Sequence, residues 1–456
     1  MEDTHHGGPT ATAPAEDYIA RYEAKTPGSR ALHERSRRYT PGGISHNNRY
    51  YPPYPIYFSR AHGCRLWDVD GNEYLDLWMA HYDAILGHAP KAVVSRVREA
   101  MENGLHVGLA MEHEIELAQR VCDLMPAAEQ VRFCASGTEA TMYAVRLARG
   151  FTGRNVILKM VGGWHGANTD LMVDIAPPEF IGAEGRGLPP DLTRYTRSAQ
   201  LNDIEDTARA IREAGDDWAG IILEPAMGAG GFIPVEQDYL AFIKEEAKKA
   251  GALIIFDEVI TGFRLALGGA QEYFDFTPDL VTLGKVLGGG MPVGAVAGRE
   301  DVLAISSVEA QRSKADKLVI GGGTYSCNPL TMIAGAVTLD ILKEKGSGFY
   351  AALEGFNTRL CQGIRAAFEH VAIPVHVNQV GSLQEVHFLR EPGLPVRNMA
   401  DVVANTVMEK RVELATRLRN QGVFIFHGGA LSAAHSGEDV ELIVAAYARC
   451  AAEMAG

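Results

Sequence analysis

A single lysine, Lys285, stands between a short apolar run and a series of glycines. The run covers residues 280–283, and three consecutive glycines follow the lysine at residues 288–290. This pattern predicts a buried strand that carries a lysine at its carboxyl end. A desolvated lysine loses part of its preference for the charged form, and a neutral amine can form a Schiff base. A surface lysine beside a flexible glycine loop is the alternative that the pattern leaves open.

A second apolar run, residues 252–256, ends in Asp257 and Glu258. It predicts a buried parallel strand with a carboxylate at the edge where open α/β sheets bind ligands. A carboxylate in that place can keep a pyridinium nitrogen protonated, as an electron-accepting cofactor requires. An aspartate that caps the next helix would explain the same residue.

Small and hydroxyl-bearing residues, Ser136, Gly137 and Thr138, precede a helix predicted over residues 140–149. At the start of a helix, backbone N–H groups and a hydroxyl can converge on an anion, and a phosphate would fit there. An ordinary helix cap would use the same residues.

The phosphate cradle, the strand-end aspartate and the strand-end lysine follow one another in that order along the chain, and together they make up a pyridoxal phosphate (PLP) site. From about residue 39 onward the sequence resembles the class III aminotransferases of fold type I, and within that class the glutamate-1-semialdehyde aminomutase family. The resemblance is carried by the segments SGTEATMYAVRLARGFTGR, GGWHG, IILEP, IIFDEVITGFR, TLGKVLGGGMPVGAVAGR and GGGTYSCNPLTM. It implies PLP as cofactor, with Lys285 as its covalent attachment and Asp257 at its ring nitrogen.

The resemblance also implies further cofactor contacts beyond the phosphate cradle. Trp164 would stack on the cofactor ring, with His165 next to it, and Val259 would cover the opposite face of the ring. Glu224 would lie near the oxygen edge of the cofactor, although a capping carboxylate is the alternative. Thr324 would reach the phosphate from a neighbouring subunit, so the resemblance implies a homodimer with shared active sites.

Substrate contacts are expected from Arg49, His81 and Tyr82. The aminomutase family has an arginine at the distance of Arg49 from its Pro-Gly-Gly motif, where it binds the substrate carboxylate, and a guanidinium suits that task. A solvated surface arginine is the alternative. In place of the family's aromatic residue before ILGH the chain has His81, with Tyr82 beside it, and this departure could line the substrate pocket. Residues 167–191 match the position of the family's mobile lid, and a plain surface loop is the alternative.

The alternation of apolar runs with helical segments predicts an α/β protein with a large, mostly parallel sheet and a smaller α+β domain. We expect a disordered tail at residues 1–15, a first segment of the small domain at 16–89, the large PLP-binding domain at 90–339 and the rest of the small domain at 340–456. The predicted strands of the large sheet are residues 131–134, 156–160, 220–223, 253–257 and 280–282.

The 456 residues carry a net charge of −14, which argues against nucleic acid or an anionic membrane as a partner. No apolar run is long enough to span a membrane. The six cysteines are scattered without the spacing of a metal site, which indicates reduced thiols and a cytoplasmic setting. No metal is expected, and His5 and His6 lie in the predicted tail.

We therefore predict an aminotransferase that moves an amino group from a carboxylate-bearing amino donor to a keto acid or aldehyde acceptor. One alternative is an intramolecular aminomutase, which would keep both half-reactions on one carbon skeleton. A second alternative, from another class, is a non-catalytic scaffold with the fold of a PLP enzyme. The intact Lys285 and Asp257 argue against the scaffold.

Overall fold

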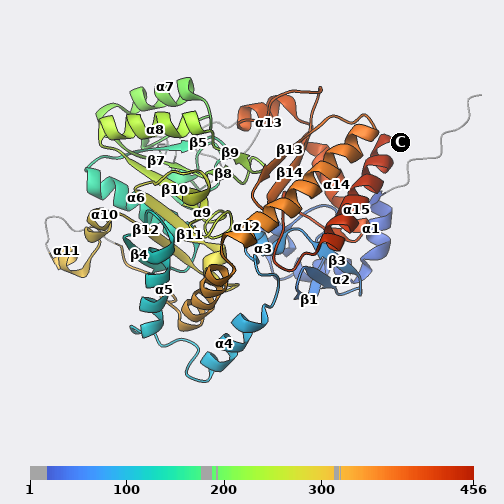
Figure 1. Ribbon diagram of the computed structural model, residues 1–456, viewed down its shortest axis with the longest axis horizontal. Helices are drawn as coiled ribbons and strands as arrows, with labels where there is room; N and C mark the ends of the chain where they lie inside the picture. Colours follow the sequence, from blue (N-terminus) through green and yellow to red (C-terminus); the bar gives the residue numbers. More distant parts are fainter. Residues whose placement is uncertain (1–17, 176–186, 190, 192–193, 313–317, 319) are drawn as a thin grey trace, which may run out of the picture.

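The computed structural model describes residues 18–175, 187–189, 191, 194–312, 318 and 320–456. The predicted tail at residues 1–15 lies outside the described residues, as does much of the predicted lid at 167–191. Figure 1 shows two halves, one built around a large sheet and one built from smaller sheets and helices. Helix α12 (Pro329–His370) runs from one half to the other.

The large sheet has seven strands in the order β4-β12-β11-β10-β7-β5-β6. All five strands predicted for it are present, and the sheet adds two that the sequence analysis missed, β6 and β12. The strands are β4 (Gln130–Cys134), β5 (Val156–Met160), β6 (Thr196–Ala199), β7 (Trp218–Leu223), β10 (Leu253–Glu258), β11 (Leu280–Gly284) and β12 (Gly294–Gly298).

Strand β10 lies at the centre of this sheet, parallel to β7 on one side and to β11 on the other. Strand β12 runs antiparallel to both of its neighbours, so the sheet is mostly parallel rather than wholly so. Every residue of β10 and β11 is buried, which agrees with the apolar runs that predicted them. The central strands therefore end in fixed positions at one edge of the sheet.

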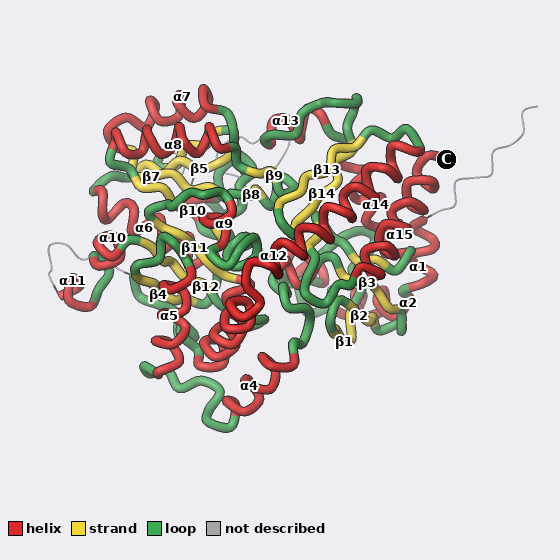
Figure 2. The backbone as a smooth tube through the Cα atoms, in the orientation of Figure 1, coloured by secondary structure: helices red, strands yellow, loops and turns green. Residues whose placement is uncertain are grey.

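Helices cover the large sheet, as the tube view in Figure 2 shows. Helix α6 (Gly137–Thr152) buries Ala140, Tyr143, Ala144 and Leu147 in a cluster with residues of the sheet. Further helices of this half, in the described part of the chain, are α4 (Lys91–Met101), α5 (Glu112–Leu124), α7 (Ile204–Ala214), α8 (Gln237–Ala250), α9 (Gly269–Tyr273), α10 (Glu300–Ala304) and α11 (Val308–Arg312). A short ribbon of β8 (Ala226–Met227) and β9 (Ile233–Pro234) follows β7.

The second half combines segments from both ends of the chain. One sheet has the order β1-β2-β3-β15 and another the order β13-β14-β16. The strands are β1 (Phe58–His62), β2 (Arg65–Asp68), β3 (Glu73–Asp76), β13 (Val375–Val380), β14 (Leu383–Phe388), β15 (Val423–Phe424) and β16 (Gly429–Ala430). Because β15 pairs in parallel with β3, residues near 75 and near 423 share one sheet.

The helices of this half are mostly C-terminal. They are α13 (Met399–Asn405), α14 (Met408–Asn420) and α15 (Gly437–Ala455), joined by α1 (Tyr18–Lys25) and α2 (Pro27–Ser36) from the N-terminal segment. Helices α1 and α2 are separate, because Pro27 occupies the first turn of α2 and the helix before it ends at Lys25.

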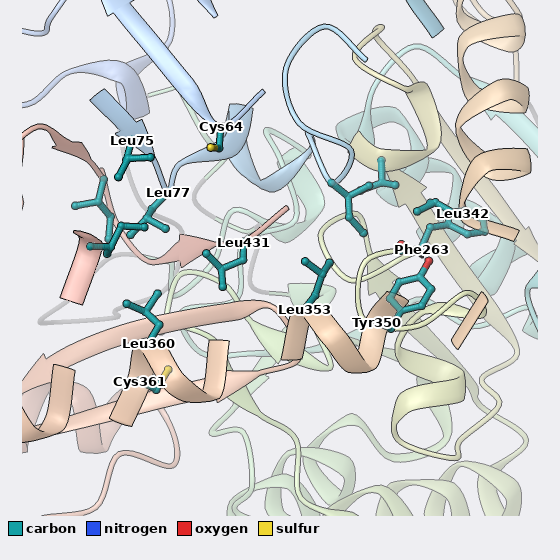
Figure 3. Packing of buried hydrophobic residues seen from close by; sticks show 14 of the residues in the cluster. Cys64, Leu75, Leu77, Phe263, Leu342, Tyr350, Leu353, Leu360, Cys361 and Leu431 are labelled. Carbon is teal, nitrogen blue, oxygen red and sulfur yellow. Dashed lines mark hydrogen bonds between the residues drawn. The ribbon is translucent and has the colours of Figure 1, made fainter. Parts of the chain in front are cut away.

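Helix α12 links the two halves through the largest apolar cluster (Figure 3). Leu342 and Tyr350 of this helix approach Phe263, and the Tyr350 hydroxyl donates a hydrogen bond of 3.0 Å to the Phe263 carbonyl oxygen. Further along α12, Leu360 and Cys361 lie in the same cluster. The helix is interrupted at Gly346, which has φ 63°.

The predicted domain boundary at residues 339/340 falls inside α12 and stays a prediction.

Three findings concern what the chain could bind or cross. Within the described ranges, no helix is long and apolar enough to pass through a membrane. In the same part of the chain, no group of three or more His, Cys, Asp or Glu side chains is placed to hold a metal ion. All six cysteines are free thiols.

Candidate active site

Asp257 and Lys285 stand at the carboxyl ends of the neighbouring strands β10 and β11. The two strands are parallel, and Asp257 lies opposite Thr282, three residues before Lys285. Both side chains line one cavity of about 1140 Å³. The structure therefore brings these two predicted site residues together at one edge of the sheet.

The Asp257 carboxylate is only 4% exposed and is held by three donors. One oxygen accepts hydrogen bonds from the Thr282 hydroxyl at 2.9 Å and from the Val259 backbone N–H at 3.1 Å. The other oxygen lies 2.7 Å from Nδ1 of His165. These contacts fix the carboxylate in one orientation. A group that has to hold a proton at one particular atom needs such a fixed orientation.

Lys285 is the one lysine among the described residues that line the cavity. It has φ 45°, a left-handed conformation at the point where β11 passes into a 3₁₀ turn (Lys285–Gly288). Burial lowers the pKa of its amine, although the carboxylates of Asp257, Glu224 and Asp83 act in the opposite direction. The amine is therefore buried in the protein. A ligand in the cavity can still reach it, because Lys285 lines the cavity wall.

The predicted phosphate cradle lies at the start of α6 and borders the same cavity. Ser136 is the N-cap of this helix, and its hydroxyl accepts a hydrogen bond of 3.3 Å from the Glu139 backbone N–H. Gly137 faces Val259, since a Cβ atom at Gly137 would come within 3.0 Å of both Val259 methyl groups. The Thr138 hydroxyl accepts a hydrogen bond of 3.2 Å from the Ala167 backbone N–H. Ser136 therefore caps the helix, as the alternative interpretation proposed. Its binding of a phosphate remains a prediction.

Trp164 and Glu224 lie on another wall of the cavity and are joined directly. The Trp164 backbone N–H donates a hydrogen bond of 2.9 Å to one Glu224 oxygen, and Gly228 donates at 3.1 Å to the other. Burial raises the pKa of the Glu224 carboxyl group. The Trp164 side chain is 44% exposed, so a broad aromatic face is available to a ligand in the cavity.

The expected substrate residues take different positions. His81 and Tyr82 line the cavity, whereas Arg49 is exposed and is not among its lining residues. Two neighbours of Arg49, His46 and Asn48, do line it. Thr324 is also exposed and does not line the cavity of its own chain.

His81 and Tyr82 belong to an unusual left-handed turn, α3 (Met79–Tyr82). All four residues have positive φ, from 43° at Met79 to 68° at Tyr82, and none of them is glycine. Such conformations are strained and persist only when the surroundings hold them. The segment before the turn is held by the Asp76 carboxylate, which accepts hydrogen bonds from the backbone N–H groups of Trp78 at 2.8 Å and Met79 at 3.1 Å.

The other end of this turn is held by Arg264. Its Nε donates a hydrogen bond of 2.5 Å to the Tyr82 carbonyl oxygen, and its Nη1 donates to the Ser382 hydroxyl and the Leu431 carbonyl oxygen, both at 3.2 Å. Arg264 is 1% exposed, and burial lowers its pKa to about 10. The turn therefore presents His81 to the cavity from a fixed support.

Several residues of the cavity wall were missed by the sequence analysis. They come from the N-terminal segment and from the C-terminal part of the chain, where no local motif marks them: His46, Trp78, Glu385, Arg411 and His427. Glu385 on β14 forms an ion pair of 3.1 Å with Arg411 on α14, and both side chains are at most 14% exposed. The polar residues among the apolar ones of β14 (Leu383–Phe388) were the one sequence signal that could have pointed to Glu385.

The residues present fit PLP. A lysine of lowered pKa and a fixed carboxylate stand at adjacent strand ends, and a helix N-terminus suited to phosphate borders the same cavity. His165 places its Nδ1 on Asp257, while its Nε2 is buried without a hydrogen-bond partner in the protein. The fold and this site define a PLP-dependent enzyme of fold type I.

The chain belongs to the class III aminotransferase family. The sequence model of the family "Aminotransferase class-III" matches residues 46–433. The chain is similar to the glutamate-1-semialdehyde 2,1-aminomutase of Methanothermobacter thermautotrophicus, with 40% identity over 91% of this chain and 96% of the relative. It is 38% identical to the enzyme of the same name from Methanobrevibacter smithii, over 90% of this chain and 95% of the relative.

Solved structures of related fold include transaminases. The structure of an omega-transaminase from Sphaerobacter thermophilus has a TM-score of 0.87 and 31% identity, and the match covers 94% of this chain and 98% of that one. A beta-phenylalanine aminotransferase from Variovorax paradoxus has a TM-score of 0.84 and 30% identity, with coverage of 95% and 96%. These matches confirm the predicted fold class, family and cofactor.

Proposed function

We propose that this enzyme transfers an amino group between two separate small molecules, an amino acid donor and a keto acid or aldehyde acceptor. The observation that carries the proposal is the placement of Lys285 and Asp257 at adjacent strand ends of one cavity. PLP, when bound, supplies a ring that accepts the electron pair left behind when a substrate loses a proton. The residues of the chain then have to hold the cofactor, orient the substrate and move that proton.

Lys285 would hold the cofactor covalently at rest and then act as the base. Once a donor amine replaces it, the Lys285 amine is free beside the substrate carbon. Its lowered pKa, caused by burial, supports a neutral amine that can accept a proton and return it to another atom. This carbon-to-carbon movement of one proton is the step that the lysine would perform.

Asp257 would hold a proton on the ring nitrogen of the cofactor. The hydrogen bonds from Thr282 and Val259 keep its carboxylate in one orientation, and the buried position strengthens its interaction with a positive charge. We further propose that Ser136, Gly137 and Thr138 bind the phosphate, that Trp164 and Val259 cover the two ring faces, and that His165 and Glu224 complete the ring's surroundings.

A homodimer is part of the proposal. Thr324 is exposed in the single chain and lies beside Tyr325, whose side chain is 64% exposed. The ring of Tyr325 lies 4.8 Å from that of His106, in a loop where Leu105 is 58% and Leu109 is 79% exposed. An apolar surface of this kind is typical of a protein interface, and a second copy placed there would bring its own Thr324 toward a neighbouring site.

An intramolecular aminomutase is the second candidate. It is supported by the curated relatives of 38% and 40% identity, which carry that name. We also propose a cytoplasmic setting, which the six free thiols support.

The decisive experiment uses purified holoenzyme with a panel of amino acids and amino acid semialdehydes, each added first without a separate acceptor. A transaminase should convert its cofactor to the aminated form, seen as an absorbance change, and should turn over only when a keto acid or aldehyde follows. An aminomutase would turn over one substrate continuously without an acceptor. If no donor or semialdehyde changed the cofactor absorbance, both functions would be rejected.

A further inference from the structure

Two imidazoles, those of His81 and His427, lie beside the indole of Trp78, and a third, that of His46, lies beside His81. The centroid of the His81 ring lies 4.3 Å from that of Trp78 and 5.2 Å from that of His46, and the His427 ring lies 6.4 Å from Trp78. All four residues line the cavity. His46, His81 and His427, here called the histidine cluster, come from three separate segments and meet only in the folded chain.

The histidine cluster has no carboxylate partner. Other histidines of the protein do have one: His88 lies 2.7 Å from Asp76, and His165 lies 2.7 Å from Asp257. In the part of the chain that the structure describes, no ion pair joins a member of the histidine cluster to an acid. The Nε2 atom of His81 is buried without a hydrogen-bond partner in the protein.

Both bases and acids surround the histidine cluster, and the bases act directly on its imidazoles. Burial, together with the charge of Lys285 and neighbouring bases, lowers the pKa of His81 to about 3. Burial, with Arg411 and Arg419 nearby, lowers the pKa of His427 to about 4, and burial lowers that of His46 beside Arg49. The acids that face this part of the cavity or lie next to it are Glu385, which is paired with Arg411, and also Asp83, Glu409, Glu224 and Asp257.

We propose that the histidine cluster is the subsite that binds the carboxylate of the substrate. The proposal rests on the proposed function for its substrate class, and it extends the site beyond Arg49, which is exposed and does not line the cavity. Ring N–H groups of the imidazoles can donate to carboxylate oxygens, and the face of Trp78 offers an apolar wall to the carbon chain. A bound carboxylate would give the imidazoles the acidic partner that no ion pair in the described part of the chain supplies.

A change in protonation follows from this arrangement. A bound anion stabilises an imidazolium, so the pKa of the imidazoles should rise from its lowered value toward or above the ordinary value of about 6.5. The complex then takes up protons, and the affinity for a carboxylate should increase as the pH falls from 8 to 6. A site built from arginine alone would bind with the same affinity over this range, because a guanidinium stays charged.

The test uses the holoenzyme and pentanoate, a carboxylate without an amino group, so that its outcome does not depend on transamination. Calorimetric titrations in phosphate and in Tris buffer measure the protons taken up, and titrations between pH 6 and 8 measure the affinity. Pentanamide, the uncharged analogue, is the matched ligand. Protonation at the cofactor-bound Lys285 is followed separately through the absorbance of the cofactor and subtracted.

We expect uptake of protons with pentanoate and none with pentanamide. His81→Gln and His427→Gln keep a hydrogen-bonding side chain but cannot take up a proton, so each should weaken pentanoate binding about tenfold at pH 6 and flatten its pH dependence. His370→Gln, at an exposed position on α12, should change neither. A pH-independent affinity for pentanoate, unchanged proton uptake in both variants, or equal binding of the acid and the amide would overturn the proposal.

Discussion

The hydroxyl of Thr282 on β11 donates a hydrogen bond of 2.9 Å to the carboxylate of Asp257, which lies opposite it on β10. The two residues are a register pair of a parallel ladder, so the backbone hydrogen bonds of the sheet set the distance between them. Thr282, which is not among the described residues that line the cavity, thereby orients the Asp257 carboxylate.

Thr282→Val should therefore lower turnover while leaving the fold intact. A hydrogen bond to a charged group contributes roughly 1.5–3 kcal/mol, so kcat should fall by about ten- to a hundredfold. Thr338→Val is the matched control, because the Thr338 hydroxyl is buried without a hydrogen-bond partner. Steady-state kinetics of both variants, with thermal unfolding as a check on folding, make the comparison. Equal losses in the two variants would mean that Thr282 does not act through Asp257.

Asp257→Asn should impair catalysis far more than folding. An amide cannot stabilise a positive charge on the ring nitrogen, and each pKa unit of lost stabilisation is ~1.4 kcal/mol, or about tenfold in rate. At a buried site the loss should be several times larger. Single-turnover rates and the free energy of unfolding should be measured together, and a variant with near-normal turnover would contradict the assigned role.

Lys285 should be the residue that carries the cofactor. Borohydride reduction of the holoenzyme followed by peptide mapping should find the label on Lys285 and none on Lys159, a fully buried lysine on β5. Lys285→Ala should abolish turnover, because the covalent attachment and the proton carrier are lost together. A label on any other lysine would reject the assignment.

Thr324 should act in the site of the partner subunit. If so, a mixed dimer of a Lys285→Ala chain and a Thr324→Ala chain has one site in which both residues are intact. Coexpression with two different affinity tags allows the mixed dimer to be isolated, and its activity should exceed that of either parent. A severe Thr324 defect that the verified mixed dimer does not repair would count against a shared site.

Arg49→Ala should raise KM for carboxylate substrates by about ten- to a hundredfold, since a charge-assisted hydrogen bond contributes roughly 1.5–3 kcal/mol. Amines without a carboxylate should be affected little. The kinetic comparison of an amino acid with its decarboxylated amine measures the difference. Equal losses for both kinds of substrate would assign Arg49 a structural role, and a native enzyme active only on simple amines would refute the substrate class.

The sequence predicted the part of the site in which an apolar run identifies a strand and the site residue follows that strand directly. Asp257 and Lys285 each follow a continuous apolar run, and parallel strands place their carboxyl ends at one edge. Strand β12 was missed because glycine and alanine dominate Gly294–Gly298 and give no strand signal. The division of the N-terminal helix at Pro27 could have been predicted from the proline itself.

The substrate side of the cavity could not be predicted in the same way. His427 and Arg411 reach it from segments hundreds of residues away from His46, and no spacing in the sequence relates them. The left-handed turn at Met79–Tyr82 lacks the glycines that usually mark such a conformation. It exists because Asp76 and Arg264 hold its two ends, and those contacts are tertiary.

The pairing of β15 with β3 has a consequence for how the chain is made. Val423 lies opposite Leu75 but follows it by 348 residues (423 − 75). During synthesis, β3 therefore remains unpaired on its β15 side until all the strands of the large sheet have been synthesised. An open edge of this kind can pair with another chain. Protection of this edge by a chaperone should therefore matter to the yield of native enzyme, and damage to β15 should appear as aggregation during synthesis rather than as a loss of activity in the finished protein.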